Sequence, residues 1–186
     1  MDELKRSVDY SRKRLQAIRN CESKVSDILW KSTQKIIAAS KRYRGAGRLT
    51  NESALLSYAK NVTAEAEESI NSYISAYSKA SCKILGIDSE NIESFLVSDI
   101  YGKTTSERNA VYLGNFAEDI VRMIKAGTLM GYSDQQILSS IRTGYKDPYH
   151  TSVITKAKRK DINIDVPSYG KGYYRNAYQN IVRNAS

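Results

Sequence analysis

A stripe of mostly apolar residues, alternating at spacings of three and four, runs through the first 43 residues. Its members are Leu4, Val8, Ser11, Leu15, Ile18, Glu22, Val25, Leu29, Ser32, Ile36, Ala39 and Tyr43. Residues three and four apart share one face of an α-helix, so the stripe predicts a single helix of about 40 residues, roughly 60 Å long at 1.5 Å per residue. Gly45-Ala46-Gly47 marks its end.

A second helix is predicted between Thr50-Asn51-Glu52, a helix-start sequence, and Gly86. Its apolar stripe consists of Leu55, Ala59, Val62, Ala66, Ile70, Tyr73, Tyr77, Ala80 and Ile84. Two long helices joined by a short glycine-containing turn predict an antiparallel hairpin. Because Ser11, Glu22 and Ser32 interrupt the first stripe, we expect this hairpin to need a partner surface.

Two capping boxes predict further helix starts. Thr104 and Glu107 fit the pattern S/T-x-x-E, and Ser133 and Gln136 fit S/T-x-x-Q. In such a box each side chain accepts a hydrogen bond from a backbone N–H that would otherwise be unpaired. Apolar residues at helical spacing follow, so helices are predicted over about 105–126 and 134–142.

The sequence therefore predicts a mainly α fold, with a long antiparallel helical hairpin, smaller helices and a short β segment near the C-terminus. The β segment rests on alternating Ile162, Ile164 and Val166, which end at Pro167. Residues 88–97 fit either a helix or a strand, and an amphipathic segment follows Tyr173.

Three regions are expected along the chain. Residues 1–86 form the hairpin, 87–142 a compact helical region, and 143–186 a basic, tyrosine-rich extension.

The net charge of +9 is segmented along the chain. Residues 1–48 carry 13 Lys/Arg and 5 Asp/Glu, residues 49–140 carry 7 and 12, and residues 141–186 carry 9 and 3. The middle region is therefore excluded as a nucleic-acid contact, whereas either end could be one. The basic–acidic–basic order of the three segments also allows the acidic segment of one copy to meet a basic segment of another.

Basic residues near these two ends are the candidate contacts for nucleic acid or for another subunit, together with interleaved tyrosines. They are Lys41, Arg42, Arg44, Lys156, Lys158, Arg159, Lys160, Lys171, Tyr173, Tyr174, Arg175 and Tyr178. Lys and Arg neutralise phosphates and aromatic rings stack on bases. Tyr and Arg also dominate protein–protein hot spots, so both interpretations stay open.

Catalytic and ligand-binding sites are not expected. Gly102-Lys103-Thr104 would end a phosphate-binding loop of the form G-x-x-x-x-G-K-[ST], but position 97 is Val97 rather than glycine. The single histidine, His150, and the two cysteines form no metal-ligand pattern. We expect no enzyme activity, no cofactor and no metal. No apolar run approaches the length of about 18–20 residues that spans a bilayer, so no membrane contact is expected.

A two-part pattern covers both capping boxes. Its residues are Gly102, Lys103, Thr104, Ser106 and Arg108, then Gly131, Ser133, Ile137 and Leu138. Over roughly residues 100–142 the pattern resembles the head-morphogenesis (minor head protein, Mu F-type) family of tailed bacteriophages.

The resemblance implies a non-enzymatic virion structural protein, assembled in the host cytoplasm as a minor head or head–tail connector component. It also implies association with the portal and neighbouring virion proteins as a homo-oligomeric ring, with the hairpin as docking element and the basic end facing DNA or a neighbour. A stand-alone helical nucleic-acid-binding protein is the alternative from a different class.

Overall fold

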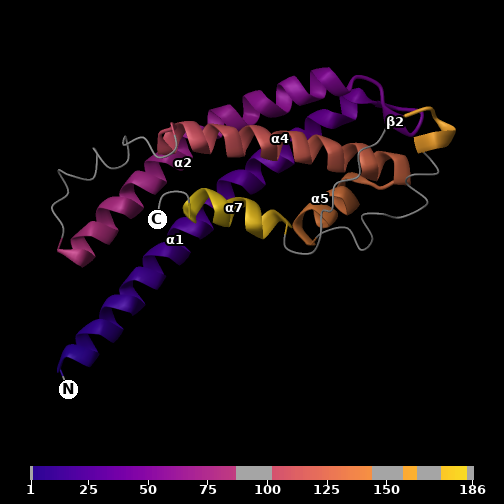
Figure 1. Cartoon of the computed structure of the whole chain (residues 1–186). Helices are drawn as coiled ribbons and strands as arrows, with labels where there is room; N and C mark the ends of the chain where they lie inside the picture. Colours follow the sequence, from indigo (N-terminus) through magenta and orange to yellow (C-terminus); the bar gives the residue numbers. More distant parts are fainter. Residues whose placement is uncertain (1, 87–101, 144–156, 163–172, 184–186) are drawn as a thin grey trace.

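The computed structural model describes residues 2–86, 102–143, 157–162 and 173–183, and these are mainly α-helical, as predicted (Figure 1). The elements are α1 (Asp2–Ser40), the 3-10 turn η1 (Lys41–Tyr43), β1 (Arg44–Gly45), β2 (Arg48–Leu49), α2 (Glu52–Leu85), α4 (Thr105–Met130), α5 (Asp134–Thr143) and α7 (Tyr173–Arg183).

The predicted hairpin of two long helices is confirmed: α1 has 39 residues, α2 has 34, and the two pack against each other. The turn between them contains two short strands that the sequence did not predict. β1 and β2 pair antiparallel, with Gly45 opposite Arg48. Ala46 and Gly47 both have positive φ, 50° and 69°, which is the backbone of a tight type I′ hairpin turn.

Local sequence signals fix where the helices begin and end. The Asn51 side chain accepts a hydrogen bond from Ala54 N at 3.0 Å and starts α2, while Gly86 ends it in the left-handed conformation. α4 extends four residues beyond the predicted end at about 126, to left-handed Gly131. Its last turn is held in the helix because Thr128 and Leu129 are buried against the rest of the molecule.

One hydrophobic core joins the later half of α1 to α2, α4, α5 and α7. Its largest fully buried side chains are Leu29, Ile36, Ile37, Leu55, Ile70, Leu113, Ile120, Met123, Ile124, Ile137, Ile141 and Ile181. Residues from distant parts of the sequence thus share one interior.

The first half of α1 contributes no fully buried side chain among residues 5–20, and only Ala17 and Ile18 pack against the edge of this core. In Figure 1 the indigo end of α1 extends past α7 and away from α4 and α5. Val8 and Leu15, which belong to the same apolar stripe as Leu29, are 60% and 55% exposed, whereas Leu29 is 0% exposed. The stripe therefore has a buried half and an exposed half.

The predicted β segment near the C-terminus falls almost wholly outside the described residues. Its first residue, Ile162, is described; it follows a helical turn at 157–159 and belongs to no strand. The undecided element at 88–97 also lies outside the described residues. Among the helices that the structure describes, none is long and apolar enough to cross a membrane.

Candidate nucleic-acid or subunit interface

Both predicted capping boxes are present. Thr104 N donates to Glu107 Oε2 at 2.7 Å and Glu107 N donates to Thr104 Oγ1 at 3.2 Å. Ser133 N donates to Gln136 Oε1 at 2.8 Å and Gln136 N donates to Ser133 Oγ at 3.3 Å. The hydrogen bonds from Thr104 lower the pKa of the Glu107 carboxyl below its ordinary value. These residues therefore start α4 and α5.

The first part of the pattern also attaches α4 to α2. Ser106 Oγ accepts from Asn71 Nδ2 at 3.0 Å, and the buried Asn109 donates to Asn71 Oδ1 at 2.9 Å. Arg108 donates to the Lys103 carbonyl at 2.8 Å and to Thr105 Oγ1 at 3.1 Å, bracing the helix start. Each contact positions the backbone or joins two helices.

Two basic segments that are far apart in the sequence meet at the hairpin turn. Lys160 Nζ donates to the carbonyls of Ala46 and Gly47 at 3.0 and 2.7 Å. Asp161, with φ of 52°, and the hydrogen bond from Ile162 N to Ala157 O at 2.9 Å close the short helical turn that carries Lys160. Figure 1 shows this turn, in orange, beside β2.

This contact brings the exposed Lys158 and Arg159 to the end of the molecule that carries the exposed Lys41, Arg42 and Arg48; these five residues and Lys160 are here called the tip cluster. Five of the six were candidate contacts from the sequence. Arg48 was missed, since only the β1–β2 turn places it beside the segment 157–162. The sequence signal that could have pointed to Arg48 is the glycine-containing turn Gly45-Ala46-Gly47, which lies between Arg44 and Arg48.

Asp134 at the start of α5 sets the position of two candidate residues. Its carboxylate lies 2.6 Å from Arg44 Nη1 and 3.2 Å from Lys41 Nζ. Arg44 also donates to the Ser40 hydroxyl, and its side chain is only 15% exposed. Arg44 is therefore a structural residue that ties the turn to α5, whereas Lys41, with a side chain 69% exposed, still faces solvent.

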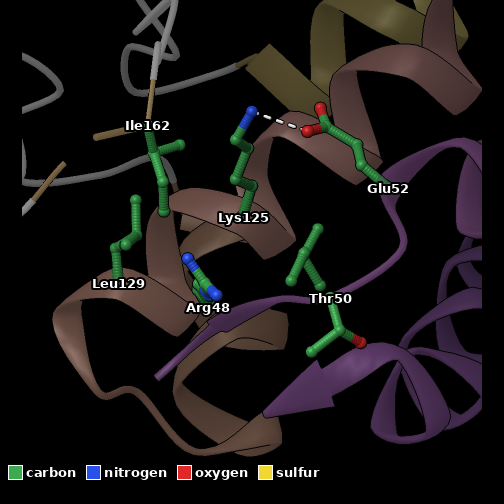
Figure 2. Close-up of a pocket in the computed structure, with 7 residues that line it drawn as sticks. Arg48, Thr50, Glu52, Lys125, Leu129 and Ile162 are labelled. Atoms are coloured by element: carbon green, nitrogen blue, oxygen red, sulfur yellow. Dashed lines mark hydrogen bonds and ion pairs between the residues drawn. The ribbon is translucent and has the colours of Figure 1, made fainter. Parts of the chain in front are cut away.

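A hollow of about 290 Å³ lies beside the tip cluster, between β2, the start of α2 and α4 (Figure 2). Its lining residues are Arg48, Leu49, Thr50, Glu52, Lys125, Leu129 and Ile162. Lys125 Nζ and Glu52 Oε2 are 2.6 Å apart. The pair neutralises most of the charge within the hollow, so the hollow contributes little to the basic surface around it.

Tyr174 and Tyr178 of α7 lie outside the tip cluster and pack within the fold. Tyr174 is 5% exposed, its hydroxyl donates to the Ser26 carbonyl at 2.5 Å, and its ring meets Trp30 edge-on at a centroid distance of 5.7 Å. Burial raises the pKa of Tyr174 to about 12. Tyr178 is half-buried and lies 5.8 Å from the Tyr174 ring. Tyr174 therefore joins α7 to α1 and is not available to stack on a base.

The remaining candidates are divided between exposed and undescribed positions. Arg175 is exposed on α7, away from the buried Tyr174. Lys156, Lys171 and the side chain of Tyr173 lie outside the described residues.

Side chains that could hold a metal are not gathered anywhere in the described part of the chain. Cys21 and Cys82 are both free thiols. Burial raises the pKa of the Cys21 thiol to about 11, which keeps it protonated and weakly nucleophilic at neutral pH.

Comparison of the chain with protein-family models, with curated proteins and with solved structures finds no match. The interpretation of the surface therefore rests on its own geometry and charge.

Replacing Tyr174 with phenylalanine is expected to lower the free energy of unfolding at pH 7 by about 0.5–1.5 kcal/mol, because the Ser26 carbonyl loses its donor. The ordinary tyrosine pKa is 10.0 and that of folded Tyr174 is about 12. The unfolded chain releases this proton first, so the stability due to Tyr174 is present below pH 10 and is lost as pH rises towards 12.

The measurement is urea denaturation of both proteins from pH 7 to 11.5, where the gap between them should narrow above pH 10. Tyr73→Phe is the matched control, since Tyr73 is 43% exposed, and it should change stability little. Unchanged stability of Tyr174→Phe over this pH range would contradict the role given to the hydrogen bond from the Tyr174 hydroxyl to the Ser26 carbonyl.

Proposed function

We propose that the chain is a non-enzymatic bacteriophage virion structural protein, a minor head or head–tail connector component that associates with the portal in several copies. The observation that carries this proposal is the two-part pattern at Gly102–Arg108 and Gly131–Leu138, which resembles the head-morphogenesis family. The neighbouring virion proteins and the portal are its proposed partners, and the virion is its proposed location.

The contacts of the pattern residues support a structural role. Thr104 and Ser133 start helices, and Gly131 turns the chain between α4 and α5. Ser106, together with Asn109 just after the first part of the pattern, holds α4 against α2. The hydrogen-bonding groups of these residues have their partners within the fold. Such contacts hold the helices in register, as expected of a structural protein.

The tip cluster supports contact with packaged DNA. Lys41, Arg42, Lys158 and Arg159 come from two separate segments and face solvent at one end of the molecule. Cationic side chains gathered in this way neutralise phosphates and release counterions, without reading a base sequence. Such binding suits a protein that meets DNA of any sequence.

Co-expression with the cognate portal protein tests the proposal. We expect the two proteins to co-purify and to give an ordered oligomer of defined mass by native mass spectrometry. Since the helices of the hairpin are the proposed docking element, charge reversal in the tip cluster should leave co-purification intact. Absence of both co-purification and an ordered oligomer would rule the virion function out.

A stand-alone helical nucleic-acid-binding protein is the second candidate, and the meeting of two basic segments at Lys160 favours it. It would bind DNA without associating with a portal. The portal experiment therefore separates the two functions, and the DNA measurement below applies to both.

Charge reversal of Arg42, Arg48 and Arg159 to glutamate is expected to weaken binding to a 20-base-pair duplex strongly. These three are exposed, and the substitutions leave the Lys160 clamp in place. For every phosphate that the variant no longer neutralises, the slope of log affinity against log salt should become shallower by about 0.9. Fluorescence anisotropy over a salt series measures both effects.

The matched control reverses Lys24, Lys31 and Lys35, three exposed residues along α1, and changes the net charge by the same amount. If both triple variants lose affinity equally, binding follows net charge and the tip cluster has no special role.

A further inference from the structure

The stripe of α1 has the spacing of a coiled-coil seam. Its positions are 8, 11, 15, 18, 22, 25, 29, 32 and 36, which alternate at spacings of three and four, with polar residues at 11, 22 and 32. This is the a/d spacing through which two helices pack side by side. From Val25 onwards the seam is buried, with Val25, Leu29 and Ile36 all 0% exposed.

The part of α1 from residue 5 to residue 20, here called the arm, is about 24 Å long at 1.5 Å per residue. In the arm the seam is exposed at Val8 (60%) and Leu15 (55%), whereas Ile18, near the end of the arm, packs partly against the core. An isolated helix of this length is only marginally stable in water, and most helix stability in proteins comes from packing an apolar face. The arm thus carries a packing face that the described residues leave uncovered.

The end of α2 approaches the arm on a different side. A hollow of about 620 Å³ separates them, lined on the arm by Arg6, Asp9, Tyr10 and Lys13. At 3.6 residues per turn these positions lie nearly opposite Val8 and Leu15. α2 therefore leaves the seam of the arm accessible.

Basic side chains flank the exposed seam on both sides. With Val8 and Leu15 at a, Arg12 and Arg19 occupy e positions, Arg14 occupies a g position, and all three arginines are exposed. The arm as a whole carries six Lys/Arg and one Asp. In coiled coils the e and g positions select the partner by charge.

We propose that the arm binds an amphipathic helix of a partner protein that has an apolar seam and acidic residues beside it. Pairing with the arm of a second copy would set arginine against arginine, and such like-charge contacts select against a partner. Duplex DNA would use the arginines but would leave Val8 and Leu15 in water. An acid-flanked helix satisfies both the charge and the apolar face.

This inference goes beyond the proposed function and does not depend on it. The partner could be a portal or any other protein with such a helix. Failure of the portal co-expression test would not contradict the proposed binding of a helix to the arm. Failure of the peptide test below would not contradict the proposed virion function.

The test uses a fluorescein-labelled 21-residue peptide of three heptads with leucine at a and d and glutamate at e and g. A second peptide carries lysine at e and g. Binding of each to the full chain is measured by fluorescence anisotropy at low salt. We expect the glutamate peptide to bind at least tenfold more tightly than the lysine peptide.

Two variants separate charge from packing. Reversal of Arg12, Arg14 and Arg19 to glutamate should invert the preference, so that the lysine peptide binds more tightly. Val8→Ser combined with Leu15→Ser should weaken glutamate-peptide binding at least tenfold. The melting temperature should be almost unchanged in both, because these side chains are exposed, and circular dichroism monitors the fold.

The Lys24, Lys31 and Lys35 charge-reversal variant is the matched control and should retain the preference for the glutamate peptide. Equal binding of the two peptides would overturn the proposal. So would a seam variant that binds the glutamate peptide as well as the original chain does. If a 20-base-pair duplex displaces the peptide and binds the seam variant undiminished, the arm is a nucleic-acid surface instead.

Discussion

The burial of one face of α1 is the constraint on which the rest of the structure depends. Val25, Leu29 and Ile36 lie along that face with no exposed surface, and burying a side chain of this kind contributes about 1.5–3 kcal/mol. α2, α4, α5 and α7 all contact α1, so α1 is the common support of segments that are far apart in the sequence. Where those neighbours end, the same face is exposed at Val8 and Leu15, and this exposed part is the proposed binding surface.

Polar interactions fix the arrangement of the elements at the hairpin turn. Asp134 holds Arg44 and Lys41, and Lys160 holds the turn at Ala46 and Gly47. The exposed Lys41–Asp134 pair is of a kind that typically contributes less than about 1 kcal/mol. The effect of these interactions is geometric, since they bring two basic segments to one end of the molecule. Positive charge is thereby gathered at the tip cluster, while the sequence itself places six Lys/Arg and one Asp in the arm.

The helices could be predicted from the sequence because their signals are local. Asn51, Thr104 and Ser133 satisfy backbone groups within one turn, and Gly86 ends α2 by a backbone conformation of its own. Which parts of the stripe are buried could not be predicted, because Leu15 and Leu29 look alike in the sequence and differ only in what packs on them.

The candidate site was less predictable than the helices for the same reason. Tyr174 and Arg44 were grouped with the exposed basic residues, but their environments are set by Ser26 and Asp134, which are distant in sequence.

The central claim is that one face of α1 is buried along the later half of the helix and exposed at Val8 and Leu15 in the arm. The difference between Leu29→Ala and Leu15→Ala in the free energy of unfolding, from urea denaturation, tests it most directly. Leu29→Ala should cost about 2–5 kcal/mol and Leu15→Ala less than about 0.5 kcal/mol; equal losses would contradict the claim.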